Sequence, residues 1–283
     1  MARFEHTVTV AAVDRDRFEE AAGALVDLFD ASRERGGAIL LPDGRPVHGL
    51  RLLKGRHLEP GARYGERPDE QGPDEEGPAD GAAGAPEPTE WTVLREWRPS
   101  RAVEVENFMA EEGVSVRVRV RLREPRGPRA LDVTLDGHNP GGGSLYRFSG
   151  RVGADLRAWW AAVERPLPAG RAPVVGRAAH RLGKARLTVV PRPAEDGCWR
   201  VSVVLSVRGR WLLRPVVAVA LALARGRVER KFGAAVDSAA AGWAVVAAQW
   251  PSLRGAALRA EIADALTGPP GLPGPPEEEP ALR

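Results

Sequence analysis

The longest regular pattern of apolar positions lies near the C-terminal end of the chain. Pro215 suits the first turn of a helix, because the N–H that proline lacks has no partner there. The pattern predicts one long helix over residues 211–250, bent or broken near Gly226, Gly233 or Gly242. Apolar or small residues recur every three or four positions, the spacing of one buried helix face: Val217, Leu221, Ala224, Val228, Phe232, Ala235, Ala239, Trp243, Val246 and Trp250.

The rest of the chain is dominated by alternation of apolar and polar residues, which predicts β-strands. The clearest strand is 114–123, in which Val and Leu alternate with Ser115 and four arginines. Asp14 is placed to cap a helix from about Arg15 to Asp30. Further strands are predicted at 4–10, 38–41, 47–58, 90–97, 101–108, 130–135, 145–152, 186–190 and 199–207, and further helices at 155–164 and 253–266.

Two segments are rich in Gly, Pro and acidic residues. Residues 65–88 contain no large apolar side chain, so they bury too little surface to offset the entropy lost on ordering. We therefore expect one domain over residues 1–267, interrupted by a disordered insertion at 65–88. A disordered acidic tail is expected at 268–283. A duplicated or two-domain arrangement is the alternative.

Charge is unevenly distributed along the chain. The formal net charge is +3, yet the stretch from Glu66 to Glu90 holds nine acids and one base, a net of −8. The tail from Gly268 to Arg283 adds a net of −2, so the body carries about +13. Nearly all the basic residues are arginine, as expected of a GC-rich bacterial genome. The excess of basic residues alone therefore carries little information about a partner.

Cysteine content and hydropathy give the expected location. Cys198 is the only cysteine, which excludes an intrachain disulfide and a multi-cysteine metal site. The N-terminal residues lack the apolar core of a signal peptide. The longest uncharged apolar run, Val216–Ala224, is far shorter than the roughly 20 residues that span a bilayer. These features predict a soluble cytoplasmic protein with no membrane span.

Three motifs, in this order, resemble the SRPBCC superfamily, which includes START domains and polyketide cyclases. Residues 58–64 (Leu-Glu-Pro-Gly-Ala-Arg-Tyr) are similar to the entry to a middle strand of cyclase-like members. Residues 91–101 are similar to their Val-x-x-x-x-Pro-x-Arg hairpin, and residues 197–215 to their last strand, turn and helix start. The resemblance implies an α+β helix-grip fold, in which a curved antiparallel sheet grips a long C-terminal helix.

The same resemblance implies a function. A cavity between sheet and helix would bind a hydrophobic small molecule, lipid-like or polyketide-like, without a cofactor. Small residues such as Ala218, Ala222 and Ala224 would leave volume for such a ligand, although alanine also allows close packing of helix on sheet. Residues expected to contact the ligand are Tyr64, Trp91, Tyr146, Leu221, Ala224, Val228 and Phe232.

Two other functions are compatible with these features. One is a polyketide cyclase or dehydratase of the same fold, in which Arg63, Tyr64 or Tyr146 orients carbonyl groups. The other is an interaction protein whose basic sheet face, with Arg117, Arg119 and Arg121, docks an acidic partner. Nucleic acid is not the expected partner, because no aromatic residue lies among these arginines for stacking. Catalytic residues and oligomeric state are not predicted.

Other candidate chemistry is weak. The five histidines are scattered with no helical pairing, so no metal site is expected. His57 with Glu59, or His6 with Glu104 or Glu106, are possible acid–base pairs across strands. The glycine-rich loop 137–144 lacks the Lys-Ser/Thr ending of a phosphate loop. Trp159 and Trp160 either close a cavity mouth or pack in the core.

Overall fold

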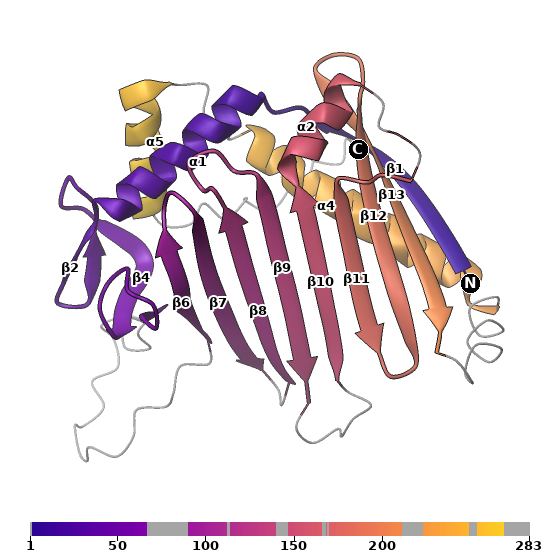
Figure 1. Cartoon of the computed structure of the whole chain (residues 1–283), viewed down its shortest axis with the longest axis horizontal. Helices are drawn as coiled ribbons and strands as arrows, with labels where there is room; N and C mark the ends of the chain where they lie inside the picture. Colours follow the sequence, from indigo (N-terminus) through magenta and orange to yellow (C-terminus); the bar gives the residue numbers. More distant parts are fainter. Residues whose placement is uncertain are drawn as a thin grey trace, which may run out of the picture.

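Thirteen strands pair side by side in one antiparallel sheet (Figure 1). The computed structural model describes residues 2–66, 90–111, 114–139, 147–165, 168, 170–210, 223–248 and 254–268. From β2 to β13, neighbours in the sheet are neighbours in sequence, and β1 then pairs with β13. The chain therefore forms a long meander that its first strand completes.

The strands differ widely in length, and the four described helices connect or follow them. The strands are β1 (Ala2–Ala11), β2 (Arg33–Arg35), β3 (Ala38–Leu40), β4 (Pro46–Lys54), β5 (Arg63–Gly65), β6 (Glu90–Arg98), β7 (Ala102–Glu111), β8 (Val114–Arg123), β9 (Ala130–His138), β10 (Phe148–Asp155), β11 (Val174–His180), β12 (Gly183–Pro193) and β13 (Cys198–Gly209). The helices are α1 (Arg15–Asp30), α2 (Leu156–Glu164), α4 (Arg225–Ala248) and α5 (Gly255–Thr267).

Local chemistry explains several element boundaries. The Asp14 side chain accepts a hydrogen bond from the Arg17 N–H at the start of α1, and Asp155 does the same for Ala158 at the start of α2. Between β12 and β13, Asp196 and Gly197 both have positive φ, the conformation of a type I′ hairpin turn. These features agree with the helix predicted at 15–30 and with the strands predicted at 186–190 and 199–207.

Register gives the sheet two chemically different faces. Because side chains alternate along each strand, directly paired residues point to the same side. One face carries the row Val105, Val120, Val133, Val152 and Leu187. The other carries charged residues, including all four arginines of β8. We call these the apolar face and the charged face.

Two separate cores cover the ends of the apolar face. At the β2–β6 end, Ile39, Leu41, Tyr64 and Leu94 are buried, with Leu28 of α1 and Ala263 of α5 packed beside them. At the β12–β13–β1 end, a second core packs against α2 and α4, around Val13, Trp160, Trp199, Val201 and Val203. Between the two ends, Met109 and Val152 are 38% and 36% exposed.

The predicted helix-grip fold is wrong. Helix α4 has 24 residues and lies against β1 and the second core, at one end of a broad sheet that does not wrap around it (Figure 1). Only Phe232, Val236 and Trp243 of α4 pack against that core, whereas Ala235 and Ala239 are exposed. The apolar stripe was misleading in part because three of its ten members are alanines, which lose little free energy when they stay in water.

The expected helix break is also wrong within α4, which continues through Gly226, Gly233 and Gly242. Residues 211–222 and 249–250 of the predicted helix lie outside the described residues. So do residues 67–88 of the predicted insertion and 269–283 of the predicted tail. None of the described helices combines the length and the apolar composition needed to cross a membrane.

Candidate functional site

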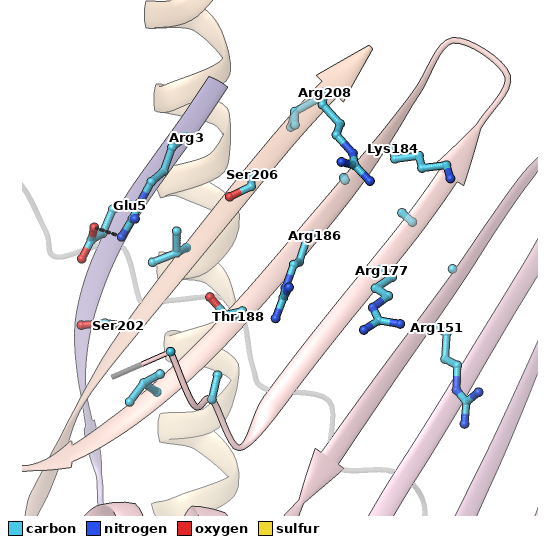
Figure 2. Close-up of a pocket in the computed structure, with 18 of the residues that line it drawn as sticks. Arg3, Glu5, Arg151, Arg177, Lys184, Arg186, Thr188, Ser202, Ser206 and Arg208 are labelled. Atoms are coloured by element: carbon cyan, nitrogen blue, oxygen red, sulfur yellow. Dashed lines mark hydrogen bonds and ion pairs between the residues drawn. The ribbon is translucent and has the colours of Figure 1, made fainter. Parts of the chain in front are cut away.

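A broad groove lies on the charged face of the sheet, over β1 and β9–β13. Its volume is about 1250 Å³, and Pro168, Gly170, Arg171 and Ala172 form part of its wall. Figure 2 shows α4 on the far side of the sheet from the groove. Among the described residues that line it, two are acidic, Glu5 and Asp136, and eight are basic. The basic residues are Arg3, Arg151, Arg171, Arg177, Lys184, Arg186, Arg192 and Arg208. We call this site the basic groove.

Its centre is a line of arginines on three adjacent strands. Arg186 of β12 is directly paired with Arg177 of β11, and Arg177 with Arg151 of β10. One step along the strands, Lys184 is directly paired with Arg208 of β13. Figure 2 shows these five side chains on the same side of the sheet, all of them exposed. Neighbouring strands are about 4.8 Å apart, so like charges are close together here.

Most of these cations have no acidic partner. Arg151 donates a hydrogen bond to Asp132 at 3.3 Å, and Arg3 contacts Glu5 at 3.3 Å. Among the described residues, no carboxylate lies within ion-pair distance of Arg177, Lys184, Arg186 or Arg208. These four residues, with Arg151, are called the cation cluster. Direct opposition of like charges in a sheet is unfavourable, so the cluster lowers stability unless an anion offsets it.

The arginines of β8 are different, although they point to the same face. Glu106 is 4% exposed and accepts hydrogen bonds from Arg95 at 2.8 Å and from Arg119 at 2.6 Å. Arg121 contacts Glu96 at 3.0 Å and Glu104 at 3.6 Å. The basic stripe identified in the sequence is thus neutralised by β6 and β7. The cation excess lies on β10–β13 instead.

Hydroxyl groups complete the lining of the basic groove. They belong to Thr134, Ser149, Thr188, Ser202 and Ser206. A hydroxyl donates one hydrogen bond to an anion, and an arginine guanidinium offers several N–H donors in a fork that matches phosphate or carboxylate. The groove is therefore chemically equipped to bind an extended anion. Within the described ranges, no three His, Cys, Asp or Glu side chains gather to hold a metal ion.

The sequence-predicted ligand residues do not meet in one place. Tyr64 is 6% exposed in the first core, whereas Phe232 packs against the second core at the other end of the sheet. Val228 and Ala224 are half-buried at the start of α4 and just before it, and Tyr146 and Leu221 lie outside the described residues. No residue of α4 lines the basic groove. The apolar ligand stays a prediction.

Trp91, another predicted ligand residue, lies on the charged face. Its ring stacks on Phe108, with centroids 4.2 Å apart and planes inclined by 27°. The Arg63 guanidinium lies 5.8 Å from the centre of the Trp91 ring. Trp159 and Trp160, by contrast, pack around Trp199 in the second core.

His57 forms a hydrogen-bonded chain that is complete without a substrate. Ser32 Oγ donates to the Phe29 carbonyl at 2.6 Å, so it accepts from His57 Nε2 at 2.8 Å. His57 Nδ1 accepts from the Tyr64 hydroxyl at 3.1 Å, which in turn accepts from the Leu58 N–H at 2.9 Å. A serine engaged in this way is not an activated nucleophile.

His6 contacts Asp237 of α4 at 2.7 Å. Neither carboxylate pairing considered for His6 or His57 is formed in the described structure.

Replacing His57 by alanine should destabilise the fold by about 2 kcal/mol, because Ser32 and Tyr64 each lose a buried partner. Burial lowers the pKa of His57 below its ordinary value of 6.5. Protons therefore bind the unfolded chain more readily, and stability falls as pH drops through 6.5. Urea unfolding between about pH 7 and pH 5 measures both effects.

Exposed His48 is the matched control, since it makes no comparable contact. His48→Gln should leave the free energy of unfolding at neutral pH unchanged. A His57→Ala protein with the wild-type pH profile would contradict this account of the hydrogen-bonded chain.

No protein-family model, curated protein or solved structure matches the chain. The resemblance to the SRPBCC superfamily is therefore neither supported nor refuted by comparison. What the protein does has to be inferred from the basic groove itself.

Sequence reasoning missed the basic groove. Its residues come from six strands and one connecting segment, and their adjacency depends on cross-strand register. One signal was available: Lys184, Arg186 and Thr188 alternate with Ala185, Leu187 and Val189. That alternation predicts a strand with one cationic face, but not the neighbours of that face.

Proposed function

We propose that the protein binds a phosphate-bearing polyanion in the basic groove. The observation that carries this proposal is the cation cluster, in which arginines face each other across adjacent strands with little acidic compensation. Between β7 and β8 on the same face, the directly paired charged residues have opposite charge, Glu104 with Arg121 and Glu106 with Arg119. A bound anion would provide for β10–β13 the compensation that Glu96, Glu104 and Glu106 provide for β8.

The shape and chemistry of the groove favour an extended ligand over a small ion. A volume of about 1250 Å³ exceeds the range of about 300–1,000 Å³ typical of small-molecule pockets. The cations are distributed along the groove instead of converging on one point. Hydroxyl donors beside guanidinium groups suit phosphate oxygens, each of which accepts more than one hydrogen bond.

The test is the triple variant Arg177→Gln, Lys184→Gln, Arg186→Gln, titrated with long-chain inorganic polyphosphate. Affinity should fall about 10- to 100-fold in roughly 0.1 M salt, and the slope of log affinity against log salt should fall by about 2. Removing like charges that oppose each other should leave the free energy of unfolding unchanged or slightly higher. Calorimetric titration and urea unfolding measure these effects.

A matched control exists on α4, which lies on the other side of the sheet. Arg227→Gln, Arg230→Gln, Lys231→Gln removes the same charges from exposed positions. This variant should retain wild-type polyphosphate affinity. Equal losses in the two triple variants would refute a specific site, because net charge alone would then explain binding. Failure of the wild-type protein to bind polyphosphate would refute the proposed function outright.

A further inference from the structure

The charged face also carries an aromatic platform beside the basic groove. Trp91 of β6 is directly paired with Phe108 of β7, and Phe108 with Arg117 of β8. Both rings are half-buried, so part of each faces solvent. Together with Arg63, they place two stacked aromatic rings between two guanidinium groups. Trp91 and Phe108 thus place one aromatic ring on each of two neighbouring strands, both on the charged face.

The platform and the groove lie on one line across the sheet. Arg117 is directly paired with Asp136, which lines the groove, and Asp136 with Ser149. The same register line continues through Ala179 to Lys184 and Arg208. Phe108 and Asp136 are two strands apart, which is about 10 Å. A flexible chain a few units long can contact both regions at once.

We propose that the polyanion is single-stranded nucleic acid, with bases stacked at Trp91 and Phe108 and backbone phosphates bound by the cation cluster. This inference rests on the proposed function. An aromatic platform next to a cationic track is the arrangement by which proteins bind single strands without sequence preference. The sequence alone pointed away from nucleic acid, because no aromatic interrupts the arginines of β8. The fold supplies the aromatics from β6 and β7.

Other polyanions would contact the cations of this face but not its aromatic rings. An acidic peptide would pair with the cations but gain nothing specific from the stacked rings. Duplex DNA is about 20 Å wide across its backbone and hides its bases from an aromatic platform, leaving only phosphate contacts. A single strand exposes phosphates and π-faces together, and thereby uses both features.

The experiment compares an oligothymidine of about 12 nucleotides with an abasic strand of the same length. Wild-type protein should bind the thymidine strand at least about fivefold more tightly, because only that strand can stack. Trp91→Ala should abolish this preference without changing affinity for the abasic strand. Trp91→Phe, which keeps a ring, should retain most of it. Fluorescence anisotropy of end-labelled strands measures the affinities of the three proteins for the two strands.

The control variant is Met109→Ala, next to Phe108 on β7 but on the opposite face, where Met109 is 38% exposed. It should leave the preference intact. Equal affinity for the two strands, or polyglutamate binding as tight as oligothymidine, would overturn the inference. If polyphosphate still binds in that case, the proposed function stands and only the choice of ligand is wrong. If polyphosphate does not bind, the proposed function and the inference about single-stranded nucleic acid are both wrong.

Discussion

Replacing Trp199 by alanine is expected to lower the free energy of unfolding by about 3–5 kcal/mol, the usual cost of removing a large buried aromatic side chain. Trp199 is 7% exposed, and its ring lies within 5.6 Å, 5.7 Å and 6.3 Å of the rings of Trp159, Trp160 and Trp243. These three rings come from α2 and α4. The substitution therefore opens a cavity at the point where both helices meet the sheet.

Urea denaturation followed by circular dichroism measures this loss. Trp91→Ala is the matched comparison, because Trp91 is only half-buried and its one aromatic partner among the described residues is Phe108. Its cost should be clearly smaller. Equal losses in the two variants would show that the second core does not depend on Trp199, and that α2 and α4 are held by other contacts.

Glu106→Gln is expected to cost about 2 kcal/mol, less than the roughly 3–5 kcal/mol for breaking a fully buried ion pair. The expected loss is smaller because the arginine partners are partly exposed. Arg95, Arg117 and Arg119 are 44%, 57% and 46% exposed, so water screens part of their mutual repulsion. The glutamine keeps the size of the side chain but removes the charge that these three guanidinium groups share.

Glu106 should also account for part of the loss of folding stability at acid pH. Hydrogen bonds from Arg95 and Arg119, with Arg95 contributing most, lower the pKa of Glu106 below its ordinary value of 4.5. Its stabilising contribution is therefore complete above pH 4.5 and is lost as pH falls toward the folded-state pKa. Urea unfolding at neutral pH and at about pH 3.5 should show wild type and Glu106→Gln converging at the lower pH.

Glu104→Gln provides the comparison on the same strand and face. Glu104 contacts Arg119 and Arg121 only at 3.6 Å and is more exposed than Glu106. It should cost less than Glu106→Gln. A larger effect at Glu104 would mean that the buried carboxylate is not the centre of this ion-pair network.

Local structure was largely predictable because its causes are local. The alternation in Val114–Arg123 predicted β8, and a capping aspartate at position 14 predicted the start of α1. β11 was missed because Gly176, Ala178 and Ala179 weaken its apolar alternation. The order of the strands was not predictable, since the pairing of β1 with β13 joins residues about two hundred positions apart.

The candidate site was hidden for the same reason. Arg151, Arg177 and Arg186 lie on three separate segments, and only the register of β10, β11 and β12 aligns them. The apolar stripe of the C-terminal helix was a weaker guide, because spacing alone does not distinguish alanines that pack from alanines that face water. Val246, assigned to the buried face by spacing, is 48% exposed.

The pairing of β1 with β13 also affects how the protein is made. A ribosome releases Ala2–Ala11 first and Cys198–Gly209 some two hundred residues later, so β1 has to wait for its partner through most of synthesis. Strands β2–β13 can assemble in the order in which they emerge, each on its predecessor. The second core, which includes Val8 and Val10 of β1 and Val13 just after it, is consequently completed only after the rest of the sheet exists. An unpaired strand is prone to pair with other chains, so this waiting period is the time of greatest risk of misassembly.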